Sequence, residues 1–307
     1  MLRFGETSAL VYVHDAKGKE GRITSHLLDP GLVSGPVFQR CSGSVLMSGT
    51  LYPPRMYADL LGIGGGNTTS RQYDSPFANQ RRPVVVAKDV TTRYQERTHD
   101  NTQRIRSHLQ ALCDGSPGHV AVFTPSYTML NDYIGEGHFN GVVVRMEDRT
   151  WSKHDVDQIL DVLDRERKLG RRVLLAGVFG GRLSEGIDYH NGLLDAVACI
   201  GIPNPPPSIH QKALRTYIEE RFGRANAWRY ASTQPAINSI LQAMGRPIRS
   251  IDDRALILLL DKRNTDRTYL ECFPKDIRMN TTSQPETTKS FARRFFSRVH
   301  RQSEGSS

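Results

Sequence analysis

Residues 255–260, Ala-Leu-Ile-Leu-Leu-Leu, form an unbroken apolar run that decides the fold class. A strand that is apolar at every position has no face to offer to water, so it must be covered on both sides. Further short runs rich in β-branched residues share this character, and longer segments with helical spacing separate them. This alternation predicts an α/β fold, with a predominantly parallel sheet flanked by helices on both faces.

The predicted strands are Ser44–Met47, Pro83–Ala87, His119–Phe123, Gly141–Val144, Arg172–Ala176, Ala196–Ile200 and Ala255–Leu260. The predicted helices are Pro53–Leu61, Thr98–Leu112, Tyr127–Ile134, Ser152–Leu169, Ile209–Phe222 and Pro235–Ile248. Ser152, with Asp155 three residues later and apolar residues beyond, is a suitable N-cap. A β-hairpin is predicted at the start, because an apolar run at 9–13 and a returning run at 22–28 flank turn residues at 15–18.

The chain divides by composition into three parts. Residues 1–40 hold the hairpin and its lead-in, 41–279 hold the alternating strands and helices, and 280–307 form a basic C-terminal tail. In the tail, Phe291, Phe295 and Val299 recur at helical spacing. This spacing predicts either a terminal helix docked on the core or a tail that orders on DNA or a partner.

A chain of 307 residues with 38% hydrophobic residues can bury a substantial core. Its net charge of +9 favours a polyanionic partner, through neutralisation of phosphates. No apolar run is long enough to cross a bilayer and no secretory signal opens the chain, so we expect no membrane partner and a cytoplasmic location, or a nuclear one in a eukaryote. Four cysteines without a C-x-x-C pair argue against a zinc ribbon or a disulfide framework, and we expect mostly buried, reduced thiols.

The strongest functional motif is Gln-Ala-Met-Gly-Arg-Pro-Ile-Arg at 242–249, before the last predicted strand. Gln242, Arg246 and Arg249 recur every three to four residues, so we expect their side chains on one face of a helix. Two guanidinium groups on one face can neutralise the charge that develops on a transferred γ-phosphoryl group. The alternative is a solvated helix face with two surface arginines.

A second motif is the glycine-rich turn Gly-Gly-Arg-Leu-Ser-Glu-Gly-Ile-Asp-Tyr at 180–189, which follows a predicted strand. Ligands bind at the carboxyl ends of parallel strands, where backbone N–H groups are able to meet phosphates. Glu185 and Asp188 could accept a ribose hydroxyl or hold Arg246 or Arg249 in position. The alternative is an ordinary acidic loop.

Two further turns carry hydroxyl groups after predicted strands. Ser48 and Thr50 precede Pro53, where they could bond a phosphate or cap the following helix. Thr124 and Ser126 precede Tyr127, and this arrangement suits the backbone of a single nucleic-acid strand with a base stacked on the tyrosine. The alternative for the second turn is a plain N-cap with a core tyrosine.

Taken in order, these four motifs resemble the third to sixth helicase motifs of the XPD-type (DinG-like) family within superfamily two. The similarity runs from about residue 28 to the Asp-Lys-Arg triplet at 261–263, which also resembles the family. The resemblance implies a RecA-like (P-loop NTPase-type) fold, specifically that of the second motor domain. It further implies ATP-driven translocation along single-stranded DNA and 5′-to-3′ unwinding in repair or transcription.

The resemblance also implies roles for individual residues. Those that would face the γ-phosphate as catalytic groups are Gln242, Arg246 and Arg249. Those that would couple nucleotide to DNA are Glu185, Gly186 and Asp188. Those that would lie along the DNA are Thr124, Ser126, Tyr127 and Ser184, with Ser48 and Thr50 relaying between the two sites.

The sequence departs from a complete helicase of this family, since it contains neither a G-x-x-x-x-G-K-[ST] phosphate loop nor a D-E-A-H box. We therefore expect ATP and Mg²⁺ to be bound mainly by a first motor domain, on the same or a separate chain. Clustered cysteines for an iron–sulfur cluster are also missing, so we expect none in this chain. A smaller departure is Pro247, which can kink a helix.

Two functions compete on these grounds. One is the second motor domain of an ATP-dependent DNA helicase, excised or separately encoded, and inactive without the first. The other is a stand-alone, non-catalytic nucleic-acid-binding or scaffold protein that keeps the helicase fold. Addition of the first motor domain would distinguish the two, because only the former would regain ATP hydrolysis.

Overall fold

The computed structural model describes residues 7–17, 20–63, 65–185, 187–189 and 192–303. The chain forms two compact units, one from residues 1–74 and 204–238 and the other from residues 75–203 and 239–307. These units differ from the sequence-based division at residues 40 and 279. The reason is that segments far apart in the chain pack together in each unit.

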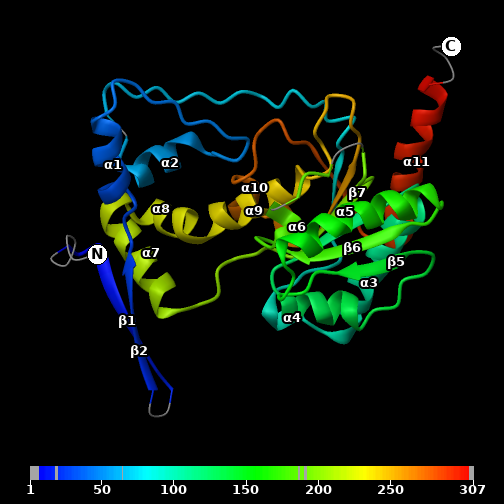
Figure 1. Ribbon diagram of the computed structural model, residues 1–307, viewed down its shortest axis with the longest axis horizontal. Helices are drawn as coiled ribbons and strands as arrows, with labels where there is room; N and C mark the ends of the chain where they lie inside the picture. Colours follow the sequence, from blue (N-terminus) through cyan, green and yellow to red (C-terminus); the bar gives the residue numbers. More distant parts are fainter. Residues whose placement is uncertain (1–6, 18–19, 64, 186, 190–191, 304–307) are drawn as a thin grey trace. The chain divides into compact units, whose positions relative to one another are not determined.

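The second unit is built on a seven-stranded sheet of order β5-β6-β4-β7-β8-β3-β9, in which every pairing is parallel (Figure 1). This confirms the predicted α/β fold with a parallel sheet. The strands are β3 Val84–Ala87, β4 Val120–Thr124, β5 Val143–Met146, β6 Val173–Val178, β7 Ala196–Ile200, β8 Leu256–Leu260 and β9 Met279–Thr282.

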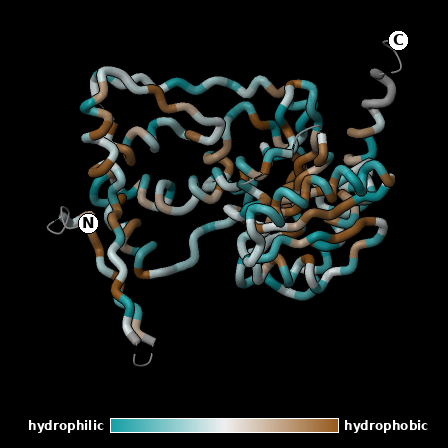
Figure 2. The backbone as a smooth tube through the Cα atoms, in the orientation of Figure 1, coloured by the Kyte–Doolittle hydropathy of each residue, from teal (hydrophilic) through white to brown (hydrophobic). Residues whose placement is uncertain are grey.

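Helices cover both faces of the sheet. Alternate strand residues, such as Val122 and Leu258, share a core cluster with residues of α3, α4 and α11. Figure 1 shows α5 on the opposite side of the sheet, and Figure 2 shows the apolar segments gathered in the strands between these layers. The helical elements of this unit are η2 Tyr94–Glu96, α3 His99–Gly115, α4 Tyr127–Leu130, η3 Asn131–Gly135, α5 Lys153–Lys168, α6 Arg182–Glu185, η5 Lys262–Thr265, α10 Arg267–Leu270 and α11 Pro285–Ser303.

The first unit combines the predicted hairpin with a small helical cluster. Buried Met56, Ile218, Tyr230 and Ala231 form its core. Asp29 is 3% exposed in its side chain and accepts hydrogen bonds from the Gly31 N–H, from Tyr217 and from Arg221. The elements are β1 Leu10–Lys17, β2 Glu20–Leu27, α1 Gly31–Gln39, α2 Pro54–Leu61, α7 Ile209–Phe222, α8 Arg224–Trp228 and η4 Arg229–Thr233, after which α9 Gln234–Met244 runs from this unit into the second.

Two sequence-based elements differ from the structure. The predicted strand Ser44–Met47 has no strand partner among the described residues and is not a strand, because an extended segment becomes one only when a neighbour takes its backbone groups. The predicted helix Pro235–Ile248 ends at Met244, three residues before Pro247, so the proline lies outside it and kinks nothing. Strand β9 and helix α1 were not predicted.

The C-terminal segment forms a docked helix, one of the two alternatives that its spacing predicted. Phe295 is buried in the core cluster with Ala292, and the Lys289 ammonium lies 2.7 Å from the Asp114 carboxylate of α3. Ala292 packs so closely on Gly115 that a Cβ there would overlap it. The side chain of Val299 lies outside the described residues.

A buried polar clamp ties α11 to α3 and to the segment after β3. His108 is fully buried, with Nδ1 2.8 Å from the Thr288 hydroxyl and Nε2 2.9 and 3.0 Å from the two Asp89 carboxylate oxygens. Because buried polar groups that lose a partner are costly, this imidazole stabilises three segments at once.

We predict that His108→Ala lowers the free energy of unfolding by about 3 kcal/mol, since it leaves a cavity and two unsatisfied partners. The measurement is urea unfolding followed by circular dichroism. His99→Ala is the matched control, because His99 is an exposed residue of the same helix and its loss should cost less than about 0.5 kcal/mol. Equal losses in the two variants would show that the clamp contributes nothing.

Candidate functional site

A buried glutamate that sequence reasoning missed organises the carboxyl edge of the sheet. Glu147 follows β5 and is 4% exposed. Its Oε1 accepts hydrogen bonds from the Arg182 N–H (2.8 Å) and the Tyr127 hydroxyl (3.3 Å), and its Oε2 accepts one from the Val178 N–H (3.1 Å). The available sequence signal was a lone carboxylate directly after an apolar strand.

The glycine-rich turn after β6 is shaped to admit this carboxylate. A Cβ on Gly181 would lie 2.7 Å from both Glu147 oxygens, and one on Gly177 would lie 2.6 Å from Oε2, so neither position tolerates a side chain without a shift. Most N–H groups of the turn are engaged within the protein, including those of residues 178, 179, 181, 182, 184 and 185. The expected cradle of phosphate-binding N–H groups is therefore not seen at these residues.

The turn after β4 is held by its own hydroxyl groups. Thr124 is buried and donates to the Ser126 carbonyl (3.0 Å), while the Ser126 hydroxyl accepts the Met129 N–H (3.2 Å) and caps α4. Half-buried Tyr127 packs against the core, and the Arg149 guanidinium lies 4.8 Å from its ring centre. Burial, followed by the nearby Glu147 charge, raises the pKa of Tyr127. In the structure Ser126 is the N-cap of α4, and the Tyr127 hydroxyl donates a hydrogen bond to Glu147.

In the motif at 180–189, buried and exposed side chains are sharply divided. Ser184 is buried and donates to the Gly181 carbonyl (3.0 Å), and buried Tyr189 donates to the Leu183 carbonyl (3.0 Å). Glu185 and Asp188 are exposed, as is Arg182, so these three charged side chains of the described segment face solvent. Gly186 lies outside the described residues.

The two arginines of the motif at 242–249 are positioned by this loop rather than by a helix face. Both follow the end of α9, which corrects the expectation that they share a helical face with Gln242. Half-buried Arg246 donates to the Ile187 carbonyl (3.1 Å), and Arg249 forms an ion pair with Asp188. Ile187 and Asp188 are adjacent in the chain, so both arginines contact one loop, and burial followed by the Arg249 charge lowers the pKa of Arg246.

The cluster of Arg246, Arg249, Asp188 and Glu185 is thus brought together in the second unit. The negative charges of Glu185 and Asp188 both act to raise the pKa of Arg246, against the larger effect of burial. Tyr189 follows Asp188 in this loop and is buried, and burial raises its pKa. Gln242 is half-buried on α9.

Ser48 and Thr50 belong to the first unit. Their hydroxyl oxygens lie 3.2 Å apart, and the Ser48 hydroxyl accepts the Thr50 N–H (3.2 Å). Neither caps α2, whose N-cap residue Pro53 has no side-chain capping bond. The capping alternative is therefore wrong, and the phosphate alternative stays a prediction.

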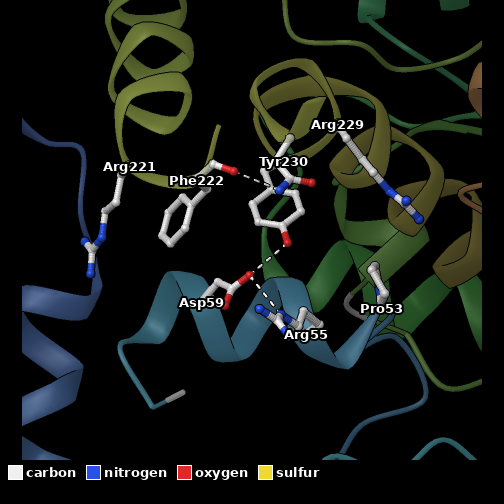
Figure 3. A pocket seen from close by; sticks show the side chains of 8 residues that line it. Pro53, Arg55, Asp59, Arg221, Phe222, Arg229 and Tyr230 are labelled. Carbon is white, nitrogen blue, oxygen red and sulfur yellow. Dashed lines mark hydrogen bonds and ion pairs between the residues drawn. The ribbon is translucent and has the colours of Figure 1, made fainter. Parts of the chain in front are cut away.

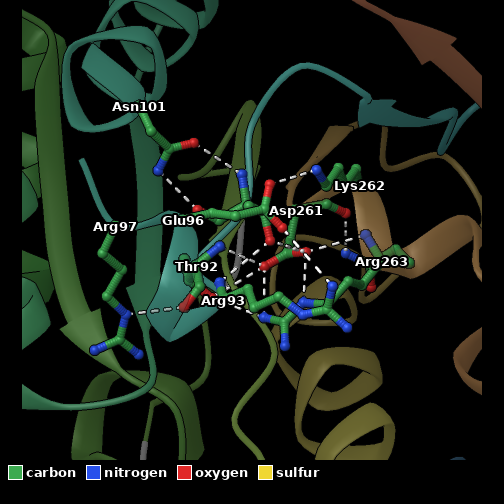
Figure 4. A network of polar contacts seen from close by, with 10 residues as sticks. Thr92, Arg93, Glu96, Arg97, Asn101, Asp261, Lys262 and Arg263 are labelled. Atoms are coloured by element: carbon green, nitrogen blue, oxygen red, sulfur yellow. Dashed lines mark hydrogen bonds and ion pairs between the residues drawn. The ribbon is translucent and has the colours of Figure 1, made fainter. Parts of the chain in front are cut away.

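A second buried carboxylate fixes the carboxyl ends of β3 and β8 (Figure 4). Asp261 is fully buried and accepts bonds from the Thr92 N–H (2.8 Å), the Thr91 and Thr92 hydroxyls, and the Arg263 guanidinium (2.7 Å). Burial acts to raise the pKa of Asp261, but the bonds from Arg263 and the Thr92 N–H outweigh it, and the pKa is lowered. The Asp-Lys-Arg triplet therefore anchors the segment that follows β3.

The first unit holds a cavity of about 590 Å³ that none of the motif residues except Pro53 lines. Figure 3 shows Tyr230 and Arg55 converging on Asp59, with contacts of 2.9 and 3.7 Å. Arg221 also lines the cavity, but its guanidinium pairs with Asp29. Much of the positive charge of this cavity is thus engaged by carboxylates of the same unit.

The described residues contain no group of three or more His, Cys, Asp or Glu side chains that could hold a metal ion. All four cysteines are free, three of them buried, and burial raises the pKa of the Cys113 thiol to about 12. None of the described helices combines the length and apolar character needed to span a bilayer.

Comparison with solved structures shows the fold to which this parallel sheet belongs. The structure named XPD_APO superposes with a TM-score of 0.70 over 92% of this chain and 55% of its own, at 23% identity, and XPD_Helicase gives 0.69 over 92% and 49%, also at 23%. The fold is therefore that of a RecA-like helicase motor domain.

The Helicase C-terminal domain family matches residues 109–280. The chain is 30% identical over 227 residues to the ATP-dependent DNA helicase XPD of Sulfolobus acidocaldarius (71% of this chain, 39% of that protein), and 27% identical over 259 residues to the ATP-dependent DNA helicase chl-1 of Caenorhabditis elegans (80% and 31%). The chain thus spans between about a third and two fifths of the length of these relatives. It belongs to the helicase C-terminal domain family of XPD- and CHL1-like superfamily 2 DNA helicases, which confirms the resemblance.

We predict that Glu147→Gln lowers the free energy of local opening at the carboxyl edge by about 2 kcal/mol. A glutamine offers one acceptor oxygen to three donors, and its amide group faces one of them. Hydrogen exchange at the Val178 and Arg182 amides should accelerate. Glu136→Gln is the control, since Glu136 is an exposed residue of the same unit. Unchanged protection of both amides in Glu147→Gln would remove Glu147 from its organising role.

Proposed function

We propose that this chain acts as the second motor domain of an ATP-dependent 5′-to-3′ DNA helicase and works only together with a first motor domain. The observation that carries the proposal is that Arg246 and Arg249 contact the adjacent residues Ile187 and Asp188 of the loop that also holds exposed Glu185. Two neighbouring cations raise each other's energy, and an anion placed between them relieves that cost. A nucleotide γ-phosphate is such an anion.

The first motor domain supplies most contacts to ATP and Mg²⁺. It carries the phosphate loop and the metal carboxylates, which this sequence lacks. The second domain supplies Arg249 and Arg246 to the transition state, with Gln242 beside them. Alone, it binds ATP weakly and hydrolyses it no faster than background.

Asp188 and Glu185 act as the nucleotide-responsive part of the site, with Gly186 between them. In the absence of nucleotide, Asp188 holds Arg249. When the γ-phosphate arrives, Arg249 exchanges one anion for another and the loop is released. Because buried Ser184 and Tyr189 anchor the same loop, its movement is transmitted to the carboxyl edge.

Single-stranded DNA runs along that carboxyl edge in this proposal. Ser126 and Tyr127 contact the strand, while Thr124 and Ser184 act through the turns that their buried hydroxyl groups hold in place. In the first unit, Ser48 and Thr50 relay between DNA and nucleotide.

The exposure of the apolar segment after Ser44 is a further argument for a partner domain. Val45 and Met47 are 88% and 87% exposed, and Leu46 is also exposed. Consecutive exposed apolar side chains favour burial against another domain, and this run has the composition of a strand. We propose that the first motor domain takes this segment as an additional strand.

Addition of an XPD-type first motor domain should restore DNA-dependent ATP hydrolysis, and Arg249→Ala should then lower kcat by about a thousandfold with much less effect on apparent ATP affinity. Arg249→Lys should recover only part of the loss, because an ammonium lacks the planar fork. Arg165→Ala, which removes an exposed arginine of the same unit, is the control. No hydrolysis after addition would favour the stand-alone scaffold. Weakened DNA binding with unaltered turnover in Arg249→Ala would make Arg249 a DNA contact.

The chain by itself should bind single-stranded DNA weakly and with a marked dependence on salt. Each phosphate contact should add about 0.7 to the slope of log affinity against log salt. Fluorescence anisotropy of a labelled oligonucleotide at several salt concentrations measures this slope. A slope near zero would mean that phosphate contacts are not the source of binding.

A further inference from the structure

A short exposed segment after β3 combines an aromatic ring with a local excess of positive charge. The side chain of Tyr94 is 83% exposed, and the Arg97 guanidinium lies 5.8 Å from its ring centre. Arg93 and Arg97 are exposed, and Lys262 follows the neighbouring strand β8. Glu96 lies 2.5 Å from the Lys262 ammonium and 3.8 Å from Arg93, and the other carboxylate of this network, Asp261, is paired with Arg263.

The Asp261 network holds this segment in one conformation (Figure 4). The Thr92 N–H and hydroxyl donate to Asp261, and the Arg97 Nε donates to the Thr92 carbonyl (2.9 Å). Gly201 packs directly under Thr92, where a Cβ would overlap its side chain. The ring and its two arginines are thus presented on a rigid support, which lowers the entropy cost of binding a ligand.

The segment lies on the same edge of the sheet as the turn at Ser126 and Tyr127. The strand order β4-β7-β8-β3 separates their carboxyl ends by three inter-strand steps, about 14 Å in all. Tyr133 lies in the helical segment that follows Tyr127. Burial raises the pKa of Tyr133, and the charge of Arg97 acts to lower it, so Arg97 exerts an electrostatic effect on this region. A few nucleotides of an extended strand bridge such a distance.

We propose that Tyr94, with Arg93 and Arg97, forms a platform on which one base of single-stranded DNA stacks while the arginines contact the adjoining phosphates. The proposal rests on the proposed function, because it extends the same DNA path along the carboxyl edge. Arg97 occupies one face of the ring, and the open face accepts a base. A duplex offers no unpaired base to this ring, and the cationic surroundings match phosphate charge.

The experiment uses the 307-residue chain and an oligonucleotide of about 16 nucleotides in which each base in turn is replaced by an abasic unit. For the unchanged protein, one position should weaken binding by about tenfold, the scale of one stacked base. Tyr94→Ala should bind the intact strand about tenfold more weakly and lose sensitivity to that position. Tyr94→Phe should keep the affinity of the unchanged protein and its sensitivity to that position, because the aromatic ring is retained.

Two controls separate stacking from general effects. Tyr73→Ala removes another highly exposed tyrosine and should leave affinity unchanged. Arg97→Gln should lower the salt slope by about 0.7, whereas Arg165→Gln should not. Melting temperatures of Tyr73→Ala and Tyr94→Ala should match that of the unchanged protein, because both side chains are largely exposed.

The outcomes distinguish this inference from the proposed function. If the unchanged protein binds no single-stranded DNA, the proposed DNA path itself fails. If it binds, but Tyr94→Ala keeps both its affinity and its sensitivity to the abasic position, the platform is overturned and the path through Ser126 and Tyr127 stands.

Discussion

The parallel alignment of every strand in the sheet is the constraint from which the rest of the second unit follows. Parallel strands deliver all their carboxyl ends to one edge, so the turns after β3, β4, β5, β6 and β8 meet there although long stretches of sequence separate them. Two buried carboxylates, Glu147 and Asp261, then determine how those turns are held. The candidate chemistry of the chain depends on this edge and on the loop that it supports.

Burying a carboxylate is costly unless its lone pairs are satisfied. Glu147 meets the requirement with backbone N–H groups and a tyrosine hydroxyl, and Asp261 meets it with Arg263 and two threonines. Because the pKa of Asp261 is lowered in the folded protein, its contribution to stability is present above the ordinary pKa of an aspartate and is lost as pH falls through the lowered value. The Asp261 bonds that hold the segment displaying Tyr94 should therefore be retained at neutral pH and lost only in acid.

Local patterns in the sequence were enough to predict most of the parallel sheet. The apolar runs located β3, β4, β6, β7 and β8 to within one or two residues, and Ser152 caps α5 with Asp155 as expected. The predictions that failed concern elements whose structure depends on contacts between residues distant in sequence. The run at 44–47 has strand composition but no neighbour in the described chain, and α9 ends before Arg246 although its spacing continues.

The candidate site was predictable in composition but not in geometry. The motifs identified the two arginines and the acidic loop, yet the contact of Arg246 with the Ile187 carbonyl arises from a fold that brings residues some sixty positions apart together. Glu147 was missed because nothing in its own sequence neighbourhood shows that two glycines, 177 and 181, leave room for its carboxylate.

The strength of the Arg249–Asp188 pair decides whether the arginine can serve a nucleotide. Asp188 is 71% exposed and Arg249 is 39% exposed in their side chains, and such solvent-exposed pairs contribute about 0–1 kcal/mol. In the proposed function, a phosphate that accepts two guanidinium bonds at once, in a site closed to water by the first motor domain, would compete well against so weak a partner. Arg246 differs, because it is half-buried and held by a backbone carbonyl that carries no net charge. In the proposed site Arg246 would keep its position while Arg249 moves, which suits one arginine to fix the position of the phosphate and the other to respond to its binding.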